Sequence, residues 1–345
     1  MNIRSLIPPH IIRILRQNVL IRWLNRHYVL KQKNFRVYTE ITTLCNAKCK
    51  MCSRDRLIKE NKMQVINMPK EILDKIIEDI KDLVKKGYHI SFIPIGLGEP
   101  LLFPNLFSLF KTLKEIDKKI YIILTTNGVL LNAKNITSLL ESEVDEITVS
   151  LNSDDRKNYK ELMGIDTYEI VLKNTIELLK RKKNLNLSKP KISVQYLDSE
   201  FLTKSFIEIN KFWQRYLNKN DKVFFHEIVS QAGASNFNNK LANVIPMSKR
   251  FPCPECWFLI GIHINGDIYP CSPIFYWKTK KEDLYLGNIL NDSLYNLYFN
   301  NQKLRTIREN MLKNNYSRLN TCKKCDNIVL MTNPFFRNPI TKKWL

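Results

Sequence analysis

The segment that organises this sequence is Glu40-Ile41-Thr42-Thr43-Leu44-Cys45-Asn46-Ala47-Lys48-Cys49-Lys50-Met51-Cys52, in which three cysteines follow the spacing CxxxCxxC. It begins at the end of a strand-like run, 36–41, where apolar and polar residues alternate. Three thiolates on one short loop can bind three irons of a 4Fe–4S cluster and leave the fourth iron open to an outside chelator. Zinc would normally take a fourth protein ligand, so the spacing favours a cluster.

Strand-like and helix-like segments alternate from this point to about residue 230. The expected strands are 36–41, 89–95, 120–124, 146–151, 191–196 and 222–228, and the expected helices between them are 69–86, 106–116, 168–182 and 201–217. This order predicts a parallel sheet with functional loops at the carboxyl ends of its strands. A doubly wound open sheet is the alternative, but no GxGxxG or GxxxxGK[ST] follows the first strand, which counts against Rossmann or P-loop nucleotide binding.

Short polar motifs follow three of these strands in order. They are Leu97-Gly98-Glu99-Pro100, Thr125-Thr126-Asn127-Gly128 and Ser150-Leu151-Asn152. Together with the CxxxCxxC loop, they resemble the signature of the radical SAM superfamily, which we therefore take as the family of residues 36–230. The resemblance implies an α/β fold, a partial (β/α)6 TIM-like barrel, and a 4Fe–4S cluster ligated by Cys45, Cys49 and Cys52 whose open iron binds S-adenosylmethionine.

The resemblance also implies a cofactor site around the first two strand ends. Gly98 permits close backbone approach, and Glu99 offers a carboxylate to the methionine ammonium. Met51 stands where relatives often have an aromatic residue beside the adenine, and its thioether can supply a polarizable contact. Leu97 departs from the family pattern, because it stands where the first glycine of the usual pair would be, with Gly96 just before it.

Four further polar residues at strand ends are implied to lie near the ribose and carboxylate of the nucleoside: Thr126, Asn127, Ser150 and Asn152. Asn152 replaces the usual Asp of its motif. Met163 lies where many relatives have Arg. Whichever contact that Arg makes must be absent here or come from elsewhere.

A second set of cysteines follows residue 250. An Asn-Gly-Asp turn at 265–267 between alternating runs predicts a β-hairpin, and a CxxC stands at 322–325. These features resemble the SPASM or shorter twitch extension of radical SAM enzymes, with fewer cysteines than the full pattern, which implies one auxiliary 4Fe–4S cluster. The favoured ligands are Cys253, Cys271, Cys322 and Cys325, with Cys256 as the alternative to Cys253. A zinc ribbon is the competing interpretation of four such thiolates.

Cys256 permits a sharper hypothesis. If it does not ligate the cluster, its thiol could return a hydrogen atom to a substrate radical, as in redox-neutral epimerisation. The plain alternative is a structural cysteine.

The net charge of +22, from 55 Lys and Arg against 33 Asp and Glu, is the least diagnostic feature. The basic residues are scattered, and lysines outnumber arginines, although base-reading sites favour the arginine fork. We therefore expect no nucleic-acid partner, and an acidic electron donor such as a flavodoxin or ferredoxin. Residues 1–35 predict a basic helical extension packed on the protein body, with peripheral contact to an anionic membrane as the alternative.

The predicted organisation is an extension over 1–35, a barrel over 36–230, a linker over 231–249, a small cysteine-rich SPASM/twitch-like domain over 250–330 and a tail over 331–345. Clustered cysteines without a secretory signal favour a reducing cytoplasm. The resemblance implies reductive cleavage of S-adenosylmethionine to a 5′-deoxyadenosyl radical that abstracts a hydrogen atom from substrate, with the auxiliary cluster assisting oxidation or modification. We expect a peptide substrate; the alternatives are a dehydrogenase or epimerase acting on a sugar or small metabolite, and a noncatalytic iron–sulfur electron carrier.

Overall fold

The computed structural model describes residues 34–234, 253–277, 283–313, 315–323 and 325. The predicted N-terminal helix, most of the linker and the predicted tail lie outside these residues. All structural statements below concern the described ranges.

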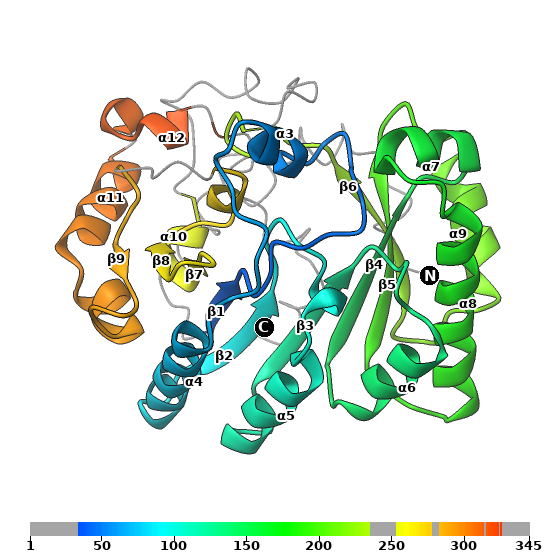
Figure 1. Cartoon of the computed structure of the whole chain (residues 1–345), viewed down its shortest axis with the longest axis horizontal. Coiled ribbons are helices and arrows are strands. Elements are labelled where there is room, and N and C mark those ends of the chain that lie inside the picture. Colours follow the sequence, from blue (N-terminus) through cyan, green and yellow to red (C-terminus); the bar gives the residue numbers. More distant parts are fainter. Residues whose placement is uncertain (1–33, 235–252, 278–282, 314, 324, 326–345) are drawn as a thin grey trace.

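Six parallel strands form one side of the sheet in the order of the sequence. They are β1 (Asn34–Thr39), β2 (His89–Pro94), β3 (Tyr121–Thr126), β4 (Glu146–Asn152), β5 (Lys191–Asp198) and β6 (Lys222–Glu227). A doubly wound sheet would reverse direction partway along the strand order. Here each crossover moves the same way, and Figure 1 shows helices on the outside of the curved sheet. The architecture is therefore the expected partial (β/α)6 barrel.

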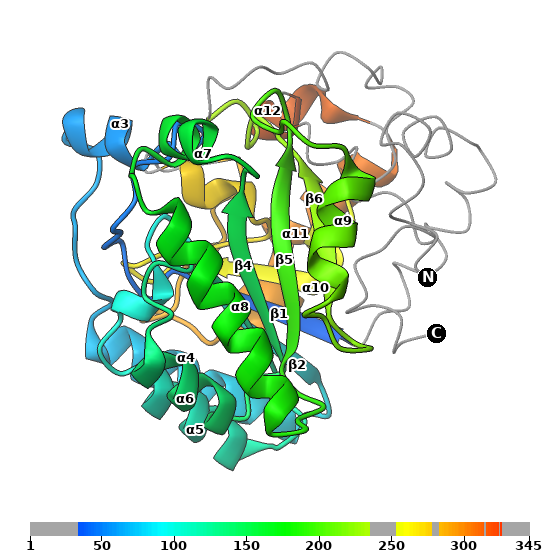
Figure 2. The ribbon, with the colours of Figure 1, turned by 90° about the vertical axis from the view of Figure 1, so that its right-hand side faces the viewer.

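The helices that cover the barrel form where apolar residues recur at helical spacing. In α4 (Lys70–Lys85), for example, Ile72, Ile76, Ile80 and Leu83 are buried and face the sheet. The others in this layer are α5 (Leu106–Ile116), α6 (Ala133–Glu141), α8 (Tyr168–Asn184) and α9 (Phe206–Gln214). Figure 2 shows α8 lying along β4 and β5.

Helix α9 is shorter than the expected 201–217 because local capping sets its start. The Ser205 hydroxyl accepts a hydrogen bond from the Glu208 amide, and the Glu208 carboxylate accepts one from the Ser205 amide. The residues before it are held as a loop, since Asp154 accepts hydrogen bonds from the backbone of Thr203 and Lys204.

Two short helices near the carboxyl ends of the strands were not expected from the sequence: α3 (Arg54–Lys59) follows the first cysteine loop, and α7 (Arg156–Met163) follows β4. The remaining short helical segment of this half is η2 (Pro100–Leu102), after Glu99.

The cysteine-rich region extends the same sheet. Strand β7 (Leu259–Ile262) pairs parallel with β1 and antiparallel with β8 (Asp267–Tyr269), which pairs with β9 (Gly287–Asn288). The predicted hairpin is thus confirmed, with Gly266 at a φ of +84° in its turn. The strand order β6-β5-β4-β3-β2-β1-β7-β8-β9 leaves both predicted domains on one continuous sheet.

The helical region that follows β9 is divided in two. A π-helical segment, η5 (Asn296–Asn300), precedes α11 (Gln302–Leu312). Asn301 stands between them because its side chain caps α11, accepting from the Leu304 amide, and also donates to the Leu286 carbonyl. The other short helices here are α10 (Glu255–Phe258), η4 (Pro273–Tyr276), η6 (Tyr316–Arg318) and α12 (Asn320–Lys323).

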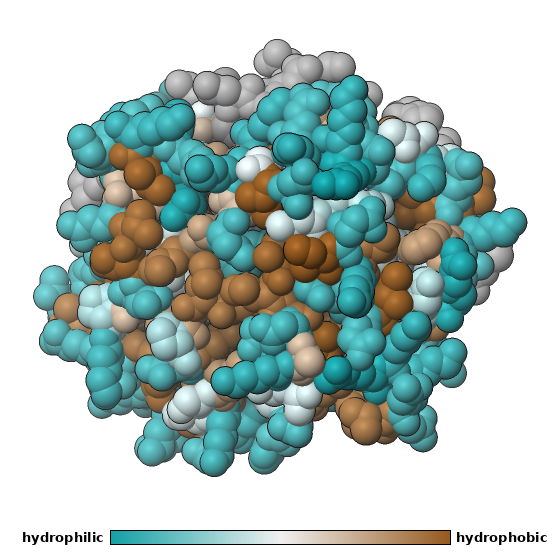
Figure 3. All heavy atoms as spheres, turned by 45° about the vertical axis from the view of Figure 1, so that its right-hand side comes forward, coloured by the Kyte–Doolittle hydropathy of each residue, from teal (hydrophilic) through white to brown (hydrophobic). Residues whose placement is uncertain are grey.

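One large apolar core runs under both halves of the sheet, from Val37 in β1 to Ile307 in α11. On the face shown in Figure 3, apolar side chains gather in a central band and hydrophilic side chains surround it. No helix in the described ranges is both long and apolar enough to cross a membrane.

Candidate functional site

The first cysteine loop is docked on the carboxyl end of α7. The Lys48 amide donates to the Met163 carbonyl at 3.1 Å, and the Lys50 amide donates to the Leu162 carbonyl at 2.9 Å. Gly164 ends the helix in the left-handed conformation, with φ +67°, and a Cβ atom there would lie 2.3 Å from the Lys48 carbonyl oxygen. A helix that the sequence analysis missed therefore holds the loop in place.

The three thiols of this loop are partly buried and lie close enough together to raise one another's pKa. Burial raises the pKa of Cys49 well above its usual value, and the neighbouring Cys52 and Cys45 thiols raise it further. Burial raises the pKa of Cys52 to about 11. Cluster binding must deprotonate these thiols, so iron loading is expected to release protons.

Glu99 lies buried behind this loop, with an exposed fraction of 3%. One carboxylate oxygen accepts hydrogen bonds from the Thr126 hydroxyl at 2.7 Å and the Leu101 amide at 3.2 Å, and the other accepts from the Asn127 amide at 2.8 Å. Burial raises the pKa of Glu99, while these hydrogen bonds act to lower it. A carboxylate offers about four acceptor positions, so one remains for a ligand cation.

Gly98 lies in close contact with the backbone that precedes the first cysteine. A Cβ atom on Gly98 would lie 2.2 Å from the Thr42 carbonyl oxygen and 2.8 Å from that of Leu44. The Glu99 amide then donates to the same Leu44 carbonyl at 2.7 Å. The glycine therefore makes room for the backbone that leads into the cysteine loop, and this contact sets where Glu99 stands.

Asn127 connects the third strand end to the cysteine loop. Its side-chain amide donates to Asn46 at 2.6 Å, and its side-chain oxygen accepts from the Val129 amide at 3.0 Å. Asn46 was not singled out in the sequence, and nothing in its local pattern distinguishes it from a spacer residue between two cysteines.

Asn152 has a φ of +65°, a conformation that asparagine tolerates better than most residues. Its amide donates to the Met163 thioether at 3.3 Å, and its oxygen accepts from Gln195 at 3.2 Å. The Cys49 thiol in turn donates to the Met163 sulfur at 3.8 Å. Met163, 1% exposed, thus occupies the space between Cys49 and Asn152.

The two remaining predicted cofactor residues lie nearby. Ser150 is half-buried and precedes the bulge at Asn152. Met51 is half-buried and packs against a small apolar cluster, Leu162, Leu197 and Phe201.

The second set of cysteines also converges. The Cys253 thiol hydrogen-bonds with the Cys256 thiol, and this bond together with burial raises the pKa of Cys253 well above its usual value. Burial raises the pKa of Cys271, and the charges of Glu255, Cys322 and Cys325 raise it further. All five thiols are therefore near neighbours.

Cys256 is the most enclosed cysteine, with an exposed fraction of 1%. Its carbonyl accepts from the Tyr298 hydroxyl at 2.9 Å and from Arg308 at 2.8 Å, which fixes its backbone. Its thiol is directed at Cys253. This burial counts against a role as hydrogen donor to a substrate, and it leaves Cys256 as a ligand alternative or a structural cysteine.

Glu255 joins two segments that carry these cysteines. Its carboxylate, 1% exposed, accepts from the Ser272 amide at 2.8 Å and the Ser272 hydroxyl at 2.6 Å. It therefore holds the turn after Cys253 against the residue that follows Cys271.

The two cysteine sets also meet. The Ser53 hydroxyl, next to Cys52, donates to the Tyr276 carbonyl at 2.9 Å. Burial raises the pKa of the Tyr276 phenol, and the Cys52 and Cys49 thiols raise it further, which places Tyr276 beside the first loop. Because Tyr276 follows Cys271 by five residues but meets Ser53 across 223 positions, no local pattern could have revealed this contact.

Both donor sets consist of thiols, which are the usual ligands of iron–sulfur clusters. Within the described ranges, no group of three or more His, Cys, Asp or Glu side chains is arranged to hold one metal ion. A four-iron cluster binds each thiolate to a different iron, so its ligands need not converge on one point. Three mutually close thiols on one loop, and a second set of four or five, suit two such clusters.

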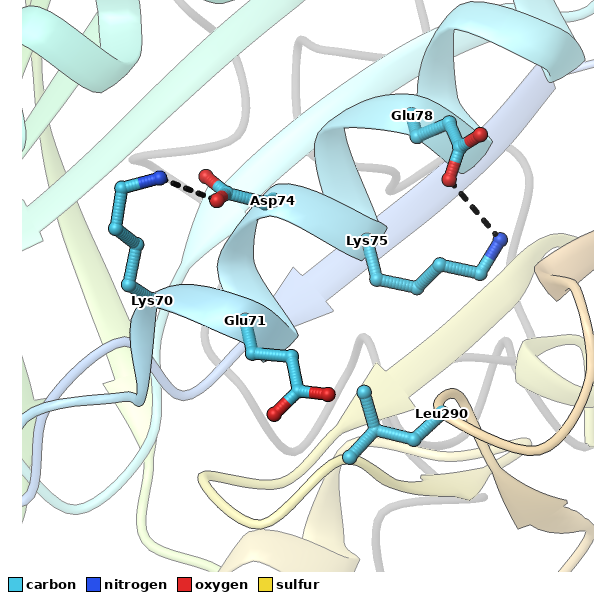
Figure 4. Close-up of a pocket in the computed structure, with 6 residues that line it drawn as sticks. All are labelled: Lys70, Glu71, Asp74, Lys75, Glu78 and Leu290. Carbon is cyan, nitrogen blue, oxygen red and sulfur yellow. Dashed lines mark hydrogen bonds and ion pairs between the residues drawn. The ribbon is translucent and has the colours of Figure 1, made fainter.

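A surface pocket of about 730 Å³ lies away from both sets. Its lining comes from the first three turns of α4 and Leu290, and none of the eight cysteines contributes to it (Figure 4). Lys70 pairs with Asp74, and Lys75 pairs with Glu78 at 3.3 Å. Because these charges are paired along one exposed helix, we assign the pocket no role in the chemistry.

Comparison with known families matches the two halves of the chain separately. The family model described as the radical SAM superfamily matches residues 39–188, which include the first cysteine loop and all three strand-end motifs. The SPASM model, described as an iron–sulfur cluster-binding domain, matches residues 253–326, which include the second set of cysteines.

Curated relatives share part of the chain. A probable GTP 3′,8-cyclase of Sulfurisphaera tokodaii is 31% identical over 164 residues, which are 46% of this chain and 48% of the relative. The chain thus spans about half the length of that relative. A GTP 3′,8-cyclase of Alkaliphilus oremlandii is 25% identical over 251 residues, 68% of this chain and 73% of the relative.

Solved structures share the fold. SuiB of Streptococcus suis bound to the precursor peptide SuiA has a TM-score of 0.60 at 19% identity, over 83% of this chain and 69% of that chain. BtrN in complex with AdoMet and 2-DOIA has a TM-score of 0.54 at 16% identity, over 85% of this chain and 92% of that chain. The chain carries a radical SAM domain and a C-terminal SPASM domain, with 4Fe–4S clusters, one of them auxiliary, and S-adenosylmethionine as its cofactors.

Proposed function

We propose that this protein is an enzyme that cleaves S-adenosylmethionine reductively and removes a hydrogen atom from a bound substrate. The observation that supports it most strongly is the buried Glu99 carboxylate, fixed by Thr126 and Asn127 directly behind the loop of three cysteines. A noncatalytic electron carrier would have no use for a buried anion with one open acceptor position at this point.

The proposal assigns Cys45, Cys49 and Cys52 as ligands of the first cluster. Cluster and S-adenosylmethionine together supply a reactive carbon-centred radical when bound. The residues of the chain position S-adenosylmethionine beside the first cluster. Glu99 holds the methionine ammonium with a charge-assisted hydrogen bond. Gly98 and Asn127 keep the cysteine loop at a fixed place relative to that carboxylate.

The cofactor's nucleoside end is proposed to lie along the next strand ends. Ser150 and Asn152 provide polar groups there, and Met51 provides a thioether for the adenine. Asn152 is already held by Gln195 and Met163, so its orientation is set before the cofactor binds.

For the auxiliary cluster we propose Cys271, Cys322 and Cys325 with either Cys253 or Cys256. The direct hydrogen bond between the last two thiols means that one of them can bind iron while the other stays beside it. The cluster is proposed to assist oxidation or modification of the substrate.

The relatives point to two kinds of substrate. SuiB is bound to a precursor peptide, and the curated relatives are named for GTP. A peptide and a small metabolite both remain within the proposal. Two exposed lysines on the first cysteine loop, Lys48 and Lys50, suit an acidic donor of the flavodoxin or ferredoxin kind. No disulfide joins any of the eight cysteines, all of which lie in the described ranges, and this supports a reducing cytoplasm as the location.

The test is production of 5′-deoxyadenosine by the anaerobically purified chain with dithionite and S-adenosylmethionine. We expect product from the wild type and almost none from Cys49→Ser. Cys256→Ser is the matched control in the other set, because the first cluster should survive it. Iron analysis should give about eight irons per chain. A fully loaded protein that forms no 5′-deoxyadenosine would identify a carrier and refute the proposal.

A further inference from the structure

The second cysteine set holds one thiol more than its cluster needs. A four-iron cluster takes one protein ligand for each iron, which makes four. Five thiols are near neighbours here: Cys253, Cys256, Cys271, Cys322 and Cys325. In the proposed ligand set Cys253 and Cys256 are alternatives for one position. One thiol of this CxxC segment therefore lies beside a ligand thiol without binding iron itself.

The two thiols of this segment are already in contact. A direct hydrogen bond joins the Cys253 and Cys256 side chains. The backbone turns tightly between them, since α10 begins at Glu255 and the Trp257 amide donates to the Pro254 carbonyl at 3.0 Å. Sulfur atoms that already touch need only a small side-chain rotation to form a bond of about 2.05 Å. The segment is therefore suited to closing as a disulfide.

The first cysteine set has the same spacing without the same contact. Cys49 and Cys52 also form a CxxC, and the Cys52 amide donates to the Cys49 carbonyl at 3.0 Å. The Cys49 thiol, however, donates to the Met163 thioether at 3.8 Å. Spacing alone does not direct two thiols at each other, so the contact between Cys253 and Cys256 is a specific feature of the second set.

The two thiols differ in their access to solvent. Cys253 is half-buried, whereas Cys256 is 1% exposed. The backbone of Cys256 is also held in place, because its carbonyl accepts hydrogen bonds from Tyr298 at 2.9 Å and Arg308 at 2.8 Å. A small oxidant therefore reaches Cys253 first, and Cys256 meets only what is already bound to Cys253. This is the relation between an attacked cysteine and a resolving cysteine.

We propose that Cys253 and Cys256 form a site of reversible oxidation, which closes to a disulfide when the auxiliary cluster is absent. The oxidant is a small disulfide of the glutathione class. Cys253 takes one half of it as a mixed disulfide and releases the other half as a thiol. The Cys256 sulfur then attacks the Cys253 sulfur, forms the internal bond and releases the second thiol. Two electrons and two protons pass from the chain to the small disulfide.

The disulfide and the auxiliary cluster exclude each other. The disulfide takes up both candidates for one ligand position and leaves only three thiols for iron. This inference rests on the proposed ligand set of that cluster. Its chemical benefit concerns the cluster-free chain: a single thiol can be oxidised stepwise to irreversible acids, whereas a disulfide is restored by a reductant.

The test is mapping of disulfides in the full chain after anaerobic incubation with oxidised glutathione, once cluster-free and once loaded with both clusters. The hydrogen bond with Cys256 and burial raise the pKa of Cys253, which slows exchange, so the reaction is followed to equilibrium. We expect the cluster-free chain to form the Cys253–Cys256 disulfide and to lose it with dithiothreitol. The Cys49–Cys52 pair should be about tenfold less oxidised at the same glutathione ratio. The loaded chain should form neither disulfide and keep about eight irons.

Two variants of the cluster-free chain separate attack from resolution. Cys256→Ser should retain one glutathione on Cys253, because no second thiol displaces it. Cys253→Ser should take up almost none on Cys256, because that thiol is enclosed. Mass spectrometry of the intact chain and of its peptides measures both. Equal uptake by the two variants would overturn the proposed order of attack.

Three other results overturn the inference. They are an oxidised cluster-free chain without the Cys253–Cys256 disulfide, equal oxidation of Cys49–Cys52, and a loaded chain that forms the disulfide while keeping about eight irons. Formation of 5′-deoxyadenosine tests the proposed function separately. A chain that forms 5′-deoxyadenosine but no disulfide refutes this inference alone, and a chain that forms the disulfide but no 5′-deoxyadenosine refutes only the proposed function.

Discussion

Gly164 is the residue at which one added methyl group should detach the first cysteine loop. It ends α7 at φ +67°, and the space where a Cβ would stand is already taken by the Lys48 carbonyl oxygen, 2.3 Å away. That carbonyl belongs to the loop between Cys45 and Cys49. Gly164→Ala must therefore move the loop, the helix end, or both.

The magnitude has two parts. A non-glycine residue in the left-handed conformation costs about 1–2 kcal/mol, and overpacking of a well-filled contact costs about 1–3 kcal/mol. Gly87 separates them, because it has φ +81° and a Cβ there would meet nothing within 4 Å. We expect Gly87→Ala to lower the free energy of unfolding by about 1–2 kcal/mol, and Gly164→Ala by about 2–5 kcal/mol in total.

The assay is urea unfolding of the cluster-free chain together with iron analysis after anaerobic reconstitution. Gly164→Ala should lose iron from the first cluster and form little 5′-deoxyadenosine, while Gly87→Ala should load normally. Equal destabilisation by the two substitutions, or a fully loaded Gly164→Ala protein, would show that the contact with the cysteine loop does not hold it.

Four further outcomes can be checked. Glu99→Gln should weaken S-adenosylmethionine binding at least tenfold while leaving iron content intact, because it removes the negative charge; unchanged affinity would dismiss the assigned contact. Lys182→Met should lower the free energy of unfolding by about 3–5 kcal/mol, because it leaves the Asp221 carboxylate buried without its cation; the Asp221 side chain is 0% exposed and lies 2.5 Å from the lysine. Adding Asp221→Asn should recover much of that loss in urea unfolding. Cys271→Ser should retain about four irons by analysis, and a protein that keeps about eight would exclude it as a ligand. Reconstitution should be more complete at pH 9 than at pH 7, because the raised thiol pKa values, about 11 for Cys52, oppose the deprotonation that iron binding requires; iron uptake that falls with pH would contradict this.

Much of the barrel was predictable because its strands are short apolar runs with polar residues directly after them. The run 120–124 corresponds to β3 at Tyr121–Thr126, and the motif with Asn127 follows it. The hairpin was predictable for a local reason too, since an Asn-Gly-Asp turn permits the positive φ of Gly266.

Helix α7 was not predictable from apolar periodicity, because only Tyr159, Leu162 and Met163 of its eight residues are buried. Its role in the site comes from backbone contacts with Lys48 and Lys50, which depend on no particular side chain. The contacts of Asn127 with Asn46 and of Ser53 with Tyr276 join residues 81 and 223 positions apart. Spacing within a motif carries no information about such pairs.

The departure at Leu97 also has a physical explanation, and it involves Glu40, which the sequence analysis treated only as the end of a strand. The Glu40 carboxylate, 0% exposed, accepts from the Leu97 amide at 3.1 Å and from the Ile264 amide at 3.3 Å. A Cβ on Gly96 would lie 2.5 Å from the Glu40 side chain, so this position requires glycine, whereas Leu97 has room for its side chain and is buried. Hydrogen bonds to a charged group contribute about 1.5–3 kcal/mol each. The Glu40 side chain thus connects three segments: the end of β1, the loop that presents Glu99 and the hairpin of the SPASM domain. The relative position of the two cysteine sets therefore depends on a carboxylate that belongs to neither set.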